Sequence, residues 1–116
     1  MSSAGIDDAR EATPVSRHRV IDATALGREG GLAGYSIVGR AGAVGYLQRV
    51  AVDPPYEGAG VGRSLVTDGL LWLRRRGARS AIVNTQQVND RALALYRALG
   101  FIADPTATLT VLSLEL

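Results

Sequence analysis

The stretch that decides the fold is residues 44–65, VGYLQRVAVDPPYEGAGVGRSL, which joins a predicted strand to a predicted helix. Residues 44–53 are expected to form an internal strand, because apolar side chains fall on both of its faces. Alternation divides these side chains into two sets, with Val44, Tyr46, Val50 and Val52 on one face and Leu47 and Ala51 on the other. Pro54 and Pro55 end the strand, since proline has no N–H group to donate to a sheet.

The loop that follows has the composition of an anion-binding turn. Gly58, Gly60 and Gly62 carry no Cβ atom, so the backbone can take up unusual conformations and approach a ligand closely. The N–H groups of this loop lie at the start of a predicted helix, where the helix dipole also favours an anion. Arg63 adds a positive charge, and a phosphate or pyrophosphate is therefore the expected ligand.

Two common nucleotide motifs do not fit this loop. A P-loop requires a lysine, and all 13 basic residues of the chain are arginines. The dinucleotide fingerprint requires a third glycine where Arg63 stands, and an acidic residue at the end of the next strand, which closes in Val83-Asn84-Thr85. A plain tight connection between strand and helix stays open as the alternative interpretation.

Hydrophobic periodicity predicts two helices and several short strands. The first helix, residues 60–77, has a broad apolar face that leaves out Leu71. The second, residues 89–99, has Asn89 as its N-cap and Tyr96 at the margin of its apolar face. A short strand or turn is predicted at residues 19–25, and strands at 32–39, 80–85, 101–102 and 106–116. The last strand has either a bulge near residues 111–112 or apolar cover on both faces. This order gives an α/β or α+β domain with a mixed sheet.

Length and composition fit one domain, with a flexible tail at residues 1–18 and the folded part at residues 19–116. The absence of cysteine and the single histidine, His18, argue against disulfides, thiol nucleophiles and a histidine-rich metal centre, so no metal is predicted. No apolar run approaches the roughly 18 residues of a membrane helix, and the N-terminus lacks a signal-peptide pattern. A cytoplasmic protein without a membrane partner is expected. The net charge of +2 is too small to predict nucleic-acid binding.

Two blocks of the sequence resemble the GNAT superfamily of N-acetyltransferases. The residues VAVDP (50–54) and EGAGVG (57–62) are similar to the family's strand ending in V-x-P and its Q/R-x-x-G-x-G/A signature. Residues 88–101, VNDRALALYRALGF, are similar to its second block, N-x-x-A-x-x-L-Y-x-x-x-G-F. The resemblance covers about residues 33–105. It implies an α+β fold with a mixed, mostly antiparallel sheet flanked by helices.

The resemblance also implies a site for acetyl-CoA as co-substrate. The backbone from Gly58 to Arg63 would hold the CoA pyrophosphate, and the preceding strand would pair its free edge with the pantetheine arm after splaying away from the next strand. Tyr96 would lie near the sulfur as a general acid. The residues assigned to acetyl-CoA in this way are Val50, Ala51, Val52, Glu57, Gly58, Ala59, Gly60, Val61, Gly62, Arg63, Asn84, Asn89, Ala92 and Tyr96.

The implied activity is transfer of an acetyl group from acetyl-CoA to a primary amine, by direct attack on the thioester. A non-catalytic acyl-CoA-binding or regulatory module is the alternative. Glu57 stands where the family has Gln or Arg, and Tyr46 and Gln48 stand where some relatives have a carboxylate, so no general base is predicted. Only about 32 residues precede the strand at 32–39, so the acceptor wall is expected to be short, and a homodimer involving Leu71 would complete it.

Overall fold

The structure, a computed structural model, describes residues 15–27, 31–86, 88–103 and 111–116. Its strands are β1 (Val15–Asp22), β2 (Leu32–Ala41), β3 (Val44–Val52), β4 (Ser80–Asn84), β5 (Ile102–Ala103) and β6 (Val111–Glu115). Its helices are α2 (Val61–Arg75) and α3 (Asp90–Ala98), with short 3₁₀ turns η1 (Ala23–Leu26) and η2 (Pro54–Tyr56). Among the described residues, no helix is both long enough and apolar enough to cross a membrane.

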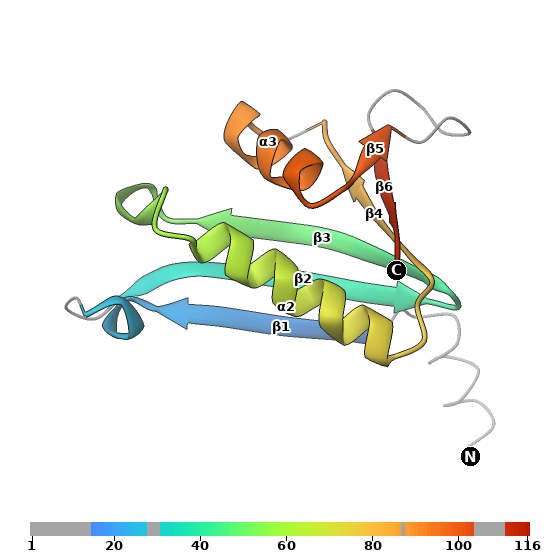
Figure 1. The fold of residues 1–116 in the computed structure, drawn as a ribbon. Coiled ribbons are helices and arrows are strands. Elements are labelled where there is room, and N and C mark those ends of the chain that lie inside the picture. The colour runs from blue at the N-terminus through green and yellow to red at the C-terminus, as the bar shows by residue number, and fades with distance from the viewer. Residues whose placement is uncertain (1–14, 28–30, 87, 104–110) are drawn as a thin grey trace, which may run out of the picture.

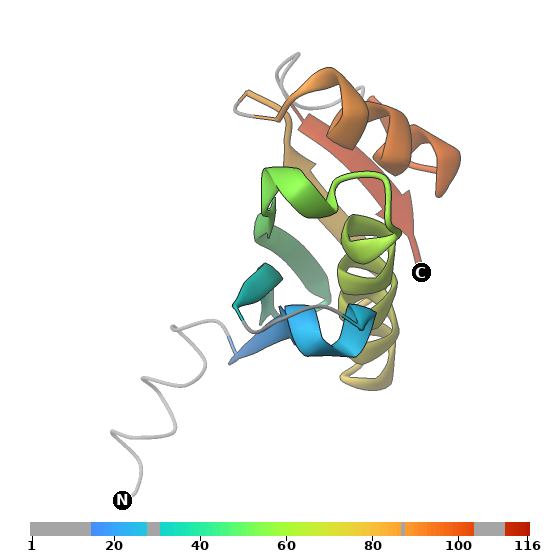
Figure 2. The ribbon, with the colours of Figure 1, turned by 90° about the vertical axis from the view of Figure 1, so that its left-hand side faces the viewer.

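The strands form one sheet in the order β1-β2-β3-β4-β6-β5 (Figure 1). Neighbouring strands are antiparallel except β3 and β4, which are parallel and are connected through α2. Both helices lie on the same side of the twisted sheet, α2 over β1–β3 and α3 beside β4 and β6 (Figure 2). The predicted α+β fold with a mixed, mostly antiparallel sheet is confirmed.

The start of the sheet differs from the prediction. β1 begins at Val15 and pairs with β2 from Val15↔Arg40 onward, so residues 15–18 belong to the sheet and the expected tail boundary at residue 18 is wrong. The alternation in VSRHRV is too weak to reveal a strand by itself, and pairing with β2 supplies the order. Residues 1–14 of the expected tail lie outside the described residues.

The expected division of β3 into two faces is also wrong. Ile37 pairs with Arg49 and Val38 pairs with Leu47, so Gln48 is an extra residue on β3, a β-bulge that inverts the alternation. Leu47 therefore faces α2, as do the two valines that follow the bulge. Val44 and Tyr46, which were expected to share a face with those valines, lie on the other side of the sheet.

Helix α2 lies directly on the sheet because glycines stand where the two surfaces meet. A Cβ atom at Gly69 of α2 would lie 2.8 Å from Cγ2 of Val38, and one at Gly45 of β3 would lie 2.5 Å from Cδ1 of Leu73. The predicted buried face of the helix is confirmed, and Leu71 is 47% exposed as expected. This close contact fixes where the N-terminus of α2 lies relative to β3.

Strand β6 pairs with β4 without a register shift, and Leu112 is buried in the core. The bulge considered for residues 111–112 is therefore not found in the described part of the strand. Leu109, whose phase suggested that bulge, lies outside the described residues. Leu112, Leu114 and Leu116 pack on the core cluster that includes residues of α2 and α3, on one side of the sheet.

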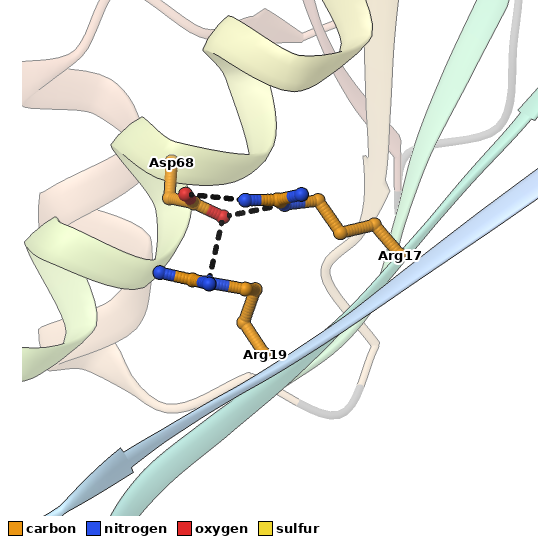
Figure 3. Close-up of polar contacts among 3 residues, drawn as sticks. All are labelled: Arg17, Arg19 and Asp68. Atoms are coloured by element: carbon orange, nitrogen blue, oxygen red, sulfur yellow. Dashed lines mark hydrogen bonds and ion pairs between the residues drawn. The ribbon is translucent and has the colours of Figure 1, made fainter.

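An ion-pair group ties the edge strand β1 to α2 (Figure 3). Arg17 donates from Nε and Nη2 to the two carboxylate oxygens of Asp68, at 3.0 and 3.1 Å, and Nε of Arg19 lies 3.6 Å from Oδ2. The hydrogen bonds from Arg17 lower the pKa of the Asp68 carboxyl, against an opposing effect of partial burial. The charged form of Asp68 is thus favoured in the folded chain.

We expect Asp68→Asn to lower the melting temperature by a few degrees at pH 7. Because the pKa of Asp68 is lower in the folded than in the unfolded chain, its contribution is fully present above the ordinary carboxyl pKa of about 4 and is lost as the pH falls through the lowered value. Thermal melts from pH 7 down to pH 2 measure this. The difference in melting temperature between wild type and Asp68→Asn should shrink in acid. The control is Asp53→Asn, at an exposed residue without a side-chain capping bond, which should change the melting temperature little. A difference that does not depend on pH would contradict this account.

Candidate functional site

A cavity of about 260 Å³ lies between the glycine loop, the second half of β3 and the first turns of α3. We call it the loop cavity. It is lined by Val50, Val52, Glu57, Gly58, Gly60, Gly62, Arg63, Asn89, Arg91, Ala92, Leu95 and Tyr96. Three segments that are separate in the sequence meet here, so the cavity exists only in the folded chain.

The loop enters α2 through two glycines in the left-handed region, Gly58 at φ +84° and Gly60 at φ +83°. The first hydrogen bond of the helix runs from the Ser64 N–H to the Gly60 carbonyl, at 3.0 Å. The three N–H groups immediately before Ser64 therefore precede the helical ladder. Such groups, together with the helix dipole, favour an anion at this end of α2.

Open space above the loop depends on Gly62. A Cβ atom at this position would lie 3.5 Å from Cγ2 of Val52 and 3.6 Å from Cδ2 of Leu95. It would make ordinary contacts with both side chains, without a clash, and would occupy the space between β3 and α3. The bare backbone at Gly62 thus keeps the loop cavity open beside the helix N-terminus.

Two arginines and one carboxylate surround this backbone. Arg63 lies in the first turn of α2, and Arg91 reaches across from α3 until its Nη1 is 3.3 Å from where a Cβ of Gly58 would be. Within the described residues neither arginine forms an ion pair, with Glu57 or any other acid. Two uncompensated guanidinium groups beside free N–H groups fit a diphosphate better than a neutral ligand.

Strands β3 and β4 separate next to the loop cavity. They pair from Val44↔Ser80 to Leu47↔Val83, and within the described residues β3 has no partner on that side from Gln48 onward (Figure 1). The free N–H and C=O groups of this edge can pair with an extended ligand as a further strand would. The expected splaying of these two strands is present.

A second cavity, of about 460 Å³, occupies the fork between the two strands. We call it the fork cavity. It is lined by Leu47, Gln48, Arg49, Val50, Val83, Asn84, Gln86, Val88 and Tyr96. Among the described residues that line it, none is a carboxylate or a histidine, so no side chain there is an evident general base.

Tyr96 is shared by the two cavities. It is the buried residue of α3, with 2% exposure, and its ring packs edge to face on Phe101 with a centroid distance of 5.4 Å. The expectation that it lies at the margin of the helix's apolar face is wrong, because α3 packs its Tyr96 side inward against β4 and β6. Burial raises the pKa of the Tyr96 phenol above its ordinary value, so the phenol is protonated at neutral pH.

Most residues that the sequence assigned to acetyl-CoA line the loop cavity. They are Val50, Val52, Glu57, Gly58, Gly60, Gly62, Arg63, Asn89, Ala92 and Tyr96. Asn89 also caps α3 as predicted, since its Oδ1 accepts the Ala92 N–H at 2.8 Å. The glycine loop and the start of α3 are thus brought together.

Four assigned residues lie elsewhere. Ala51 faces the other side of the sheet, and Val61 is buried beneath the helix. The Ala59 N–H already donates to the Tyr56 carbonyl at 3.2 Å. Asn84 lines the fork cavity, where its Oδ1 accepts the Gln86 N–H at 2.9 Å.

Several lining residues were not predicted from the sequence. Arg91 and Leu95 of α3 line the loop cavity, and Arg49, Gln86 and Val88 line the fork cavity. The helical period does place Leu95 on the same face of α3 as Arg91, one turn later. It does not show which part of the protein that face contacts. In the described residues, no group of three or more His, Asp or Glu side chains is arranged to hold a metal ion.

Comparison with known sequences gives the family. A sequence model described as the Acetyltransferase (GNAT) family matches residues 13–101. Mycothiol acetyltransferase of Amycolatopsis mediterranei is 43% identical over 63 residues, which are 54% of this chain and 21% of that protein. N-alpha-acetyltransferase RimI of Mycobacterium tuberculosis is 44% identical over 72 residues, 61% of this chain and 44% of that protein. The match thus spans about a fifth of the first relative and less than half of the second.

Solved structures share the fold. A GCN5-related N-acetyltransferase from Kribbella flavida aligns with a TM-score of 0.67 and 25% identity, over 95% of this chain and 76% of that chain. The PaiA N-acetyltransferase from Thermoplasma acidophilum, in complex with coenzyme A, aligns with a TM-score of 0.65 and 16% identity. The alignment covers 73% of this chain and 54% of that chain. With the family's sequence model covering most of its length, the chain belongs to the Acetyltransferase (GNAT) family.

Proposed function

We propose that this chain transfers an acetyl group from acetyl-CoA to a primary amine. The observation that carries the proposal is the position of Tyr96, a buried and protonated phenol that lines both the loop cavity and the fork cavity. A thioester that enters from the loop cavity and an amine that enters from the fork cavity would meet beside it. Family membership supports the same chemistry.

The loop cavity supplies the groups that a CoA diphosphate requires. The free N–H groups at the start of α2 and the side chains of Arg63 and Arg91 bind its oxygens. The unpaired edge of β3 at Val50 and Val52 binds the amide groups of the pantetheine arm. Glu57 is exposed, so its carboxylate turns to solvent at small cost.

Tyr96 acts as the general acid. Attack of the neutral amine nitrogen on the thioester carbonyl forms the C–N bond, and the C–S bond then breaks to leave a thiolate. Tyr96 donates its phenolic proton to that sulfur, and the proton that the amine loses returns through solvent to the phenolate. Because the fork cavity has no evident base, an α-amine with a pKa of about 8 is a better acceptor at neutral pH than a lysine side chain with a pKa of about 10.4.

The same lack of a base favours one alternative, a domain that binds acyl-CoA without turnover. Such a module would use the loop cavity in the same way and would leave the fork cavity without a chemical role. Tight CoA binding without thiol release for any amine distinguishes it from a transferase.

We also propose a cytoplasmic homodimer that binds neither nucleic acid nor membranes. The arginines at the end of α2 suit the helix dipole, and Arg76 lies 5.7 Å from the Trp72 ring centroid, where it stacks on an aromatic side chain of its own chain. Leu71 is 47% exposed and lines a hollow with three other leucines, together with Thr67, Arg74 and Glu115. An exposed group of leucines with a polar rim favours self-association.

Gly62→Ala should weaken CoA binding about tenfold, which corresponds to about 1.4 kcal/mol. The added methyl group would occupy the space between Val52 and Leu95 without a clash. Since alanine favours a helix by up to about 1 kcal/mol over glycine, the melting temperature should not fall. Calorimetric titration with CoA measures the affinity, with Thr67→Ala on the same helix as control. Unchanged affinity in Gly62→Ala would argue against the loop cavity as the CoA site.

Tyr96→Phe should lower kcat by about 10²-fold or more with little change in the KM for acetyl-CoA, because the ring that packs on Phe101 is kept and only the proton donor is lost. Release of free thiol from acetyl-CoA, with a panel of amines, measures the rate. Because burial raises the pKa of Tyr96, loss of wild-type activity through its ionisation should begin at a more alkaline pH than the ordinary phenol pKa of about 10 would give. Tyr46→Phe, which lines neither cavity, is the control; equal rates for Tyr96→Phe and wild type would remove Tyr96 from the mechanism.

Wild-type protein should sediment as a dimer, and Leu71→Ser should shift it toward the monomer, since the exposed leucine is replaced by a polar side chain. Val20→Ser, at a residue of β1 that is 65% exposed, is the matched control and should leave the dimer intact. Sedimentation equilibrium over a range of concentrations measures both. A compact wild-type monomer at high concentration would contradict the homodimer.

A further inference from the structure

The fork cavity has an uneven distribution of charge. Arg49 is the one charged side chain among the described residues that line it. The other polar groups are the amides of Gln48, Asn84 and Gln86 and the phenol of Tyr96. The Oδ1 atom of Asn84 already accepts a backbone N–H, so its amide presents mainly N–H donors to the cavity. The walls therefore suit a ligand with acceptor oxygens.

Arg49 has free hydrogen-bonding capacity. Its Nη1 donates to the Tyr35 hydroxyl at 3.5 Å, the outer limit for such a bond, and within the described residues it forms no ion pair. A guanidinium group has five N–H donors, and the remaining donors of Arg49 have no acceptor among the residues that the structure describes. The nearest acid in the sequence is Asp53, which follows the end of β3 and is four residues from Arg49, or about 13 Å in an extended chain.

The position of Arg49 follows from the bulge in β3. Gln48 is the extra residue, and Arg49 is the first residue after it, opposite Ile37 on β2. Pairing with β4 has ended by this point, so no neighbouring strand covers that edge of β3 within the described residues. Arg49 thus lines the opening of the fork, in the same cavity as Tyr96, and its guanidinium lies beside the Tyr35 hydroxyl of β2.

We propose that the amine acceptor of this chain carries a carboxylate within a few bonds of the amine, and that Arg49 binds this carboxylate. The inference rests on the proposed transferase function and names its substrate class. A planar guanidinium matches a carboxylate with two parallel hydrogen bonds, and it repels polyamines and other polycations. Free amino acids and peptides with an acidic first residue share this chemistry.

Two pairs of acceptors distinguish these sources. Alanine has the carboxylate of a free amino acid, and alaninamide has an amide in its place. The dipeptide Asp-Ala, amidated at its C-terminus, has a side-chain carboxylate, and the amidated dipeptide Asn-Ala has a side-chain amide instead. Wild-type protein should prefer the carboxylate member of at least one pair by about tenfold or more in kcat/KM for the neutral amine, the size expected of a hydrogen-bonded ion pair. Arg49→Gln should abolish that preference and leave the KM for acetyl-CoA unchanged. Arg97→Gln, an exposed arginine of α3 that lines neither cavity, should keep it.

Faster acetylation of both amides, or of spermidine, would overturn the inference and leave the transferase proposal standing. If CoA binds but no amine in the panel causes thiol release from acetyl-CoA, the transferase proposal fails. Calorimetry then measures the binding of the same four acceptors to the CoA-loaded protein. A preference for the carboxylate members that disappears in Arg49→Gln would still support the role of Arg49. Equal binding of both members of each pair would overturn it.

Discussion

Strand β3 contains a β-bulge at Gln48, an extra residue with no partner on β2. This bulge lies where the pairing between β3 and β4 ends, and it determines which side chains of β3 face the helices. Before it, Leu47 packs under α2 and pairs with Val83 of β4. After it, the alternation is inverted, so Val50 also faces the helices, and pairing with β4 has ended. A single bulge thereby supplies the apolar wall of the loop cavity and the free strand edge at the fork.

The two cavities beside this bulge differ in chemistry because they are built from different elements. The loop cavity combines a helix N-terminus with Arg63 and Arg91, which suits a polyanion. The fork cavity combines amide groups with a single cation, which suits a smaller polar molecule. Tyr96 belongs to both because α3 turns its tyrosine inward. Two ligands bound in this way would approach each other at one phenol.

Strong local signals made much of the fold predictable. Asn89 caps α3 and Gly77 follows α2 at φ +89°, since capping depends on a few neighbouring backbone groups. The glycine loop was assigned to an anion from its own residues, whereas Asn89, Ala92 and Tyr96 were assigned to the site only through the resemblance to the GNAT superfamily. Strand β1 was placed too late, since residues 15–18 have little strand character and become ordered by pairing with β2.

The sequence by itself determined the glycine turn, the two helices and the family resemblance, because each depends on residues close together in the chain. The bulge at Gln48, the inward position of Tyr96 and the meeting of Arg91 with the glycine loop were decided only by the tertiary structure. Register depends on the partner strand, and the orientation of a helix depends on the surface against which it packs. Neither the partner strand nor the surface under a helix can be read from the local sequence of one element.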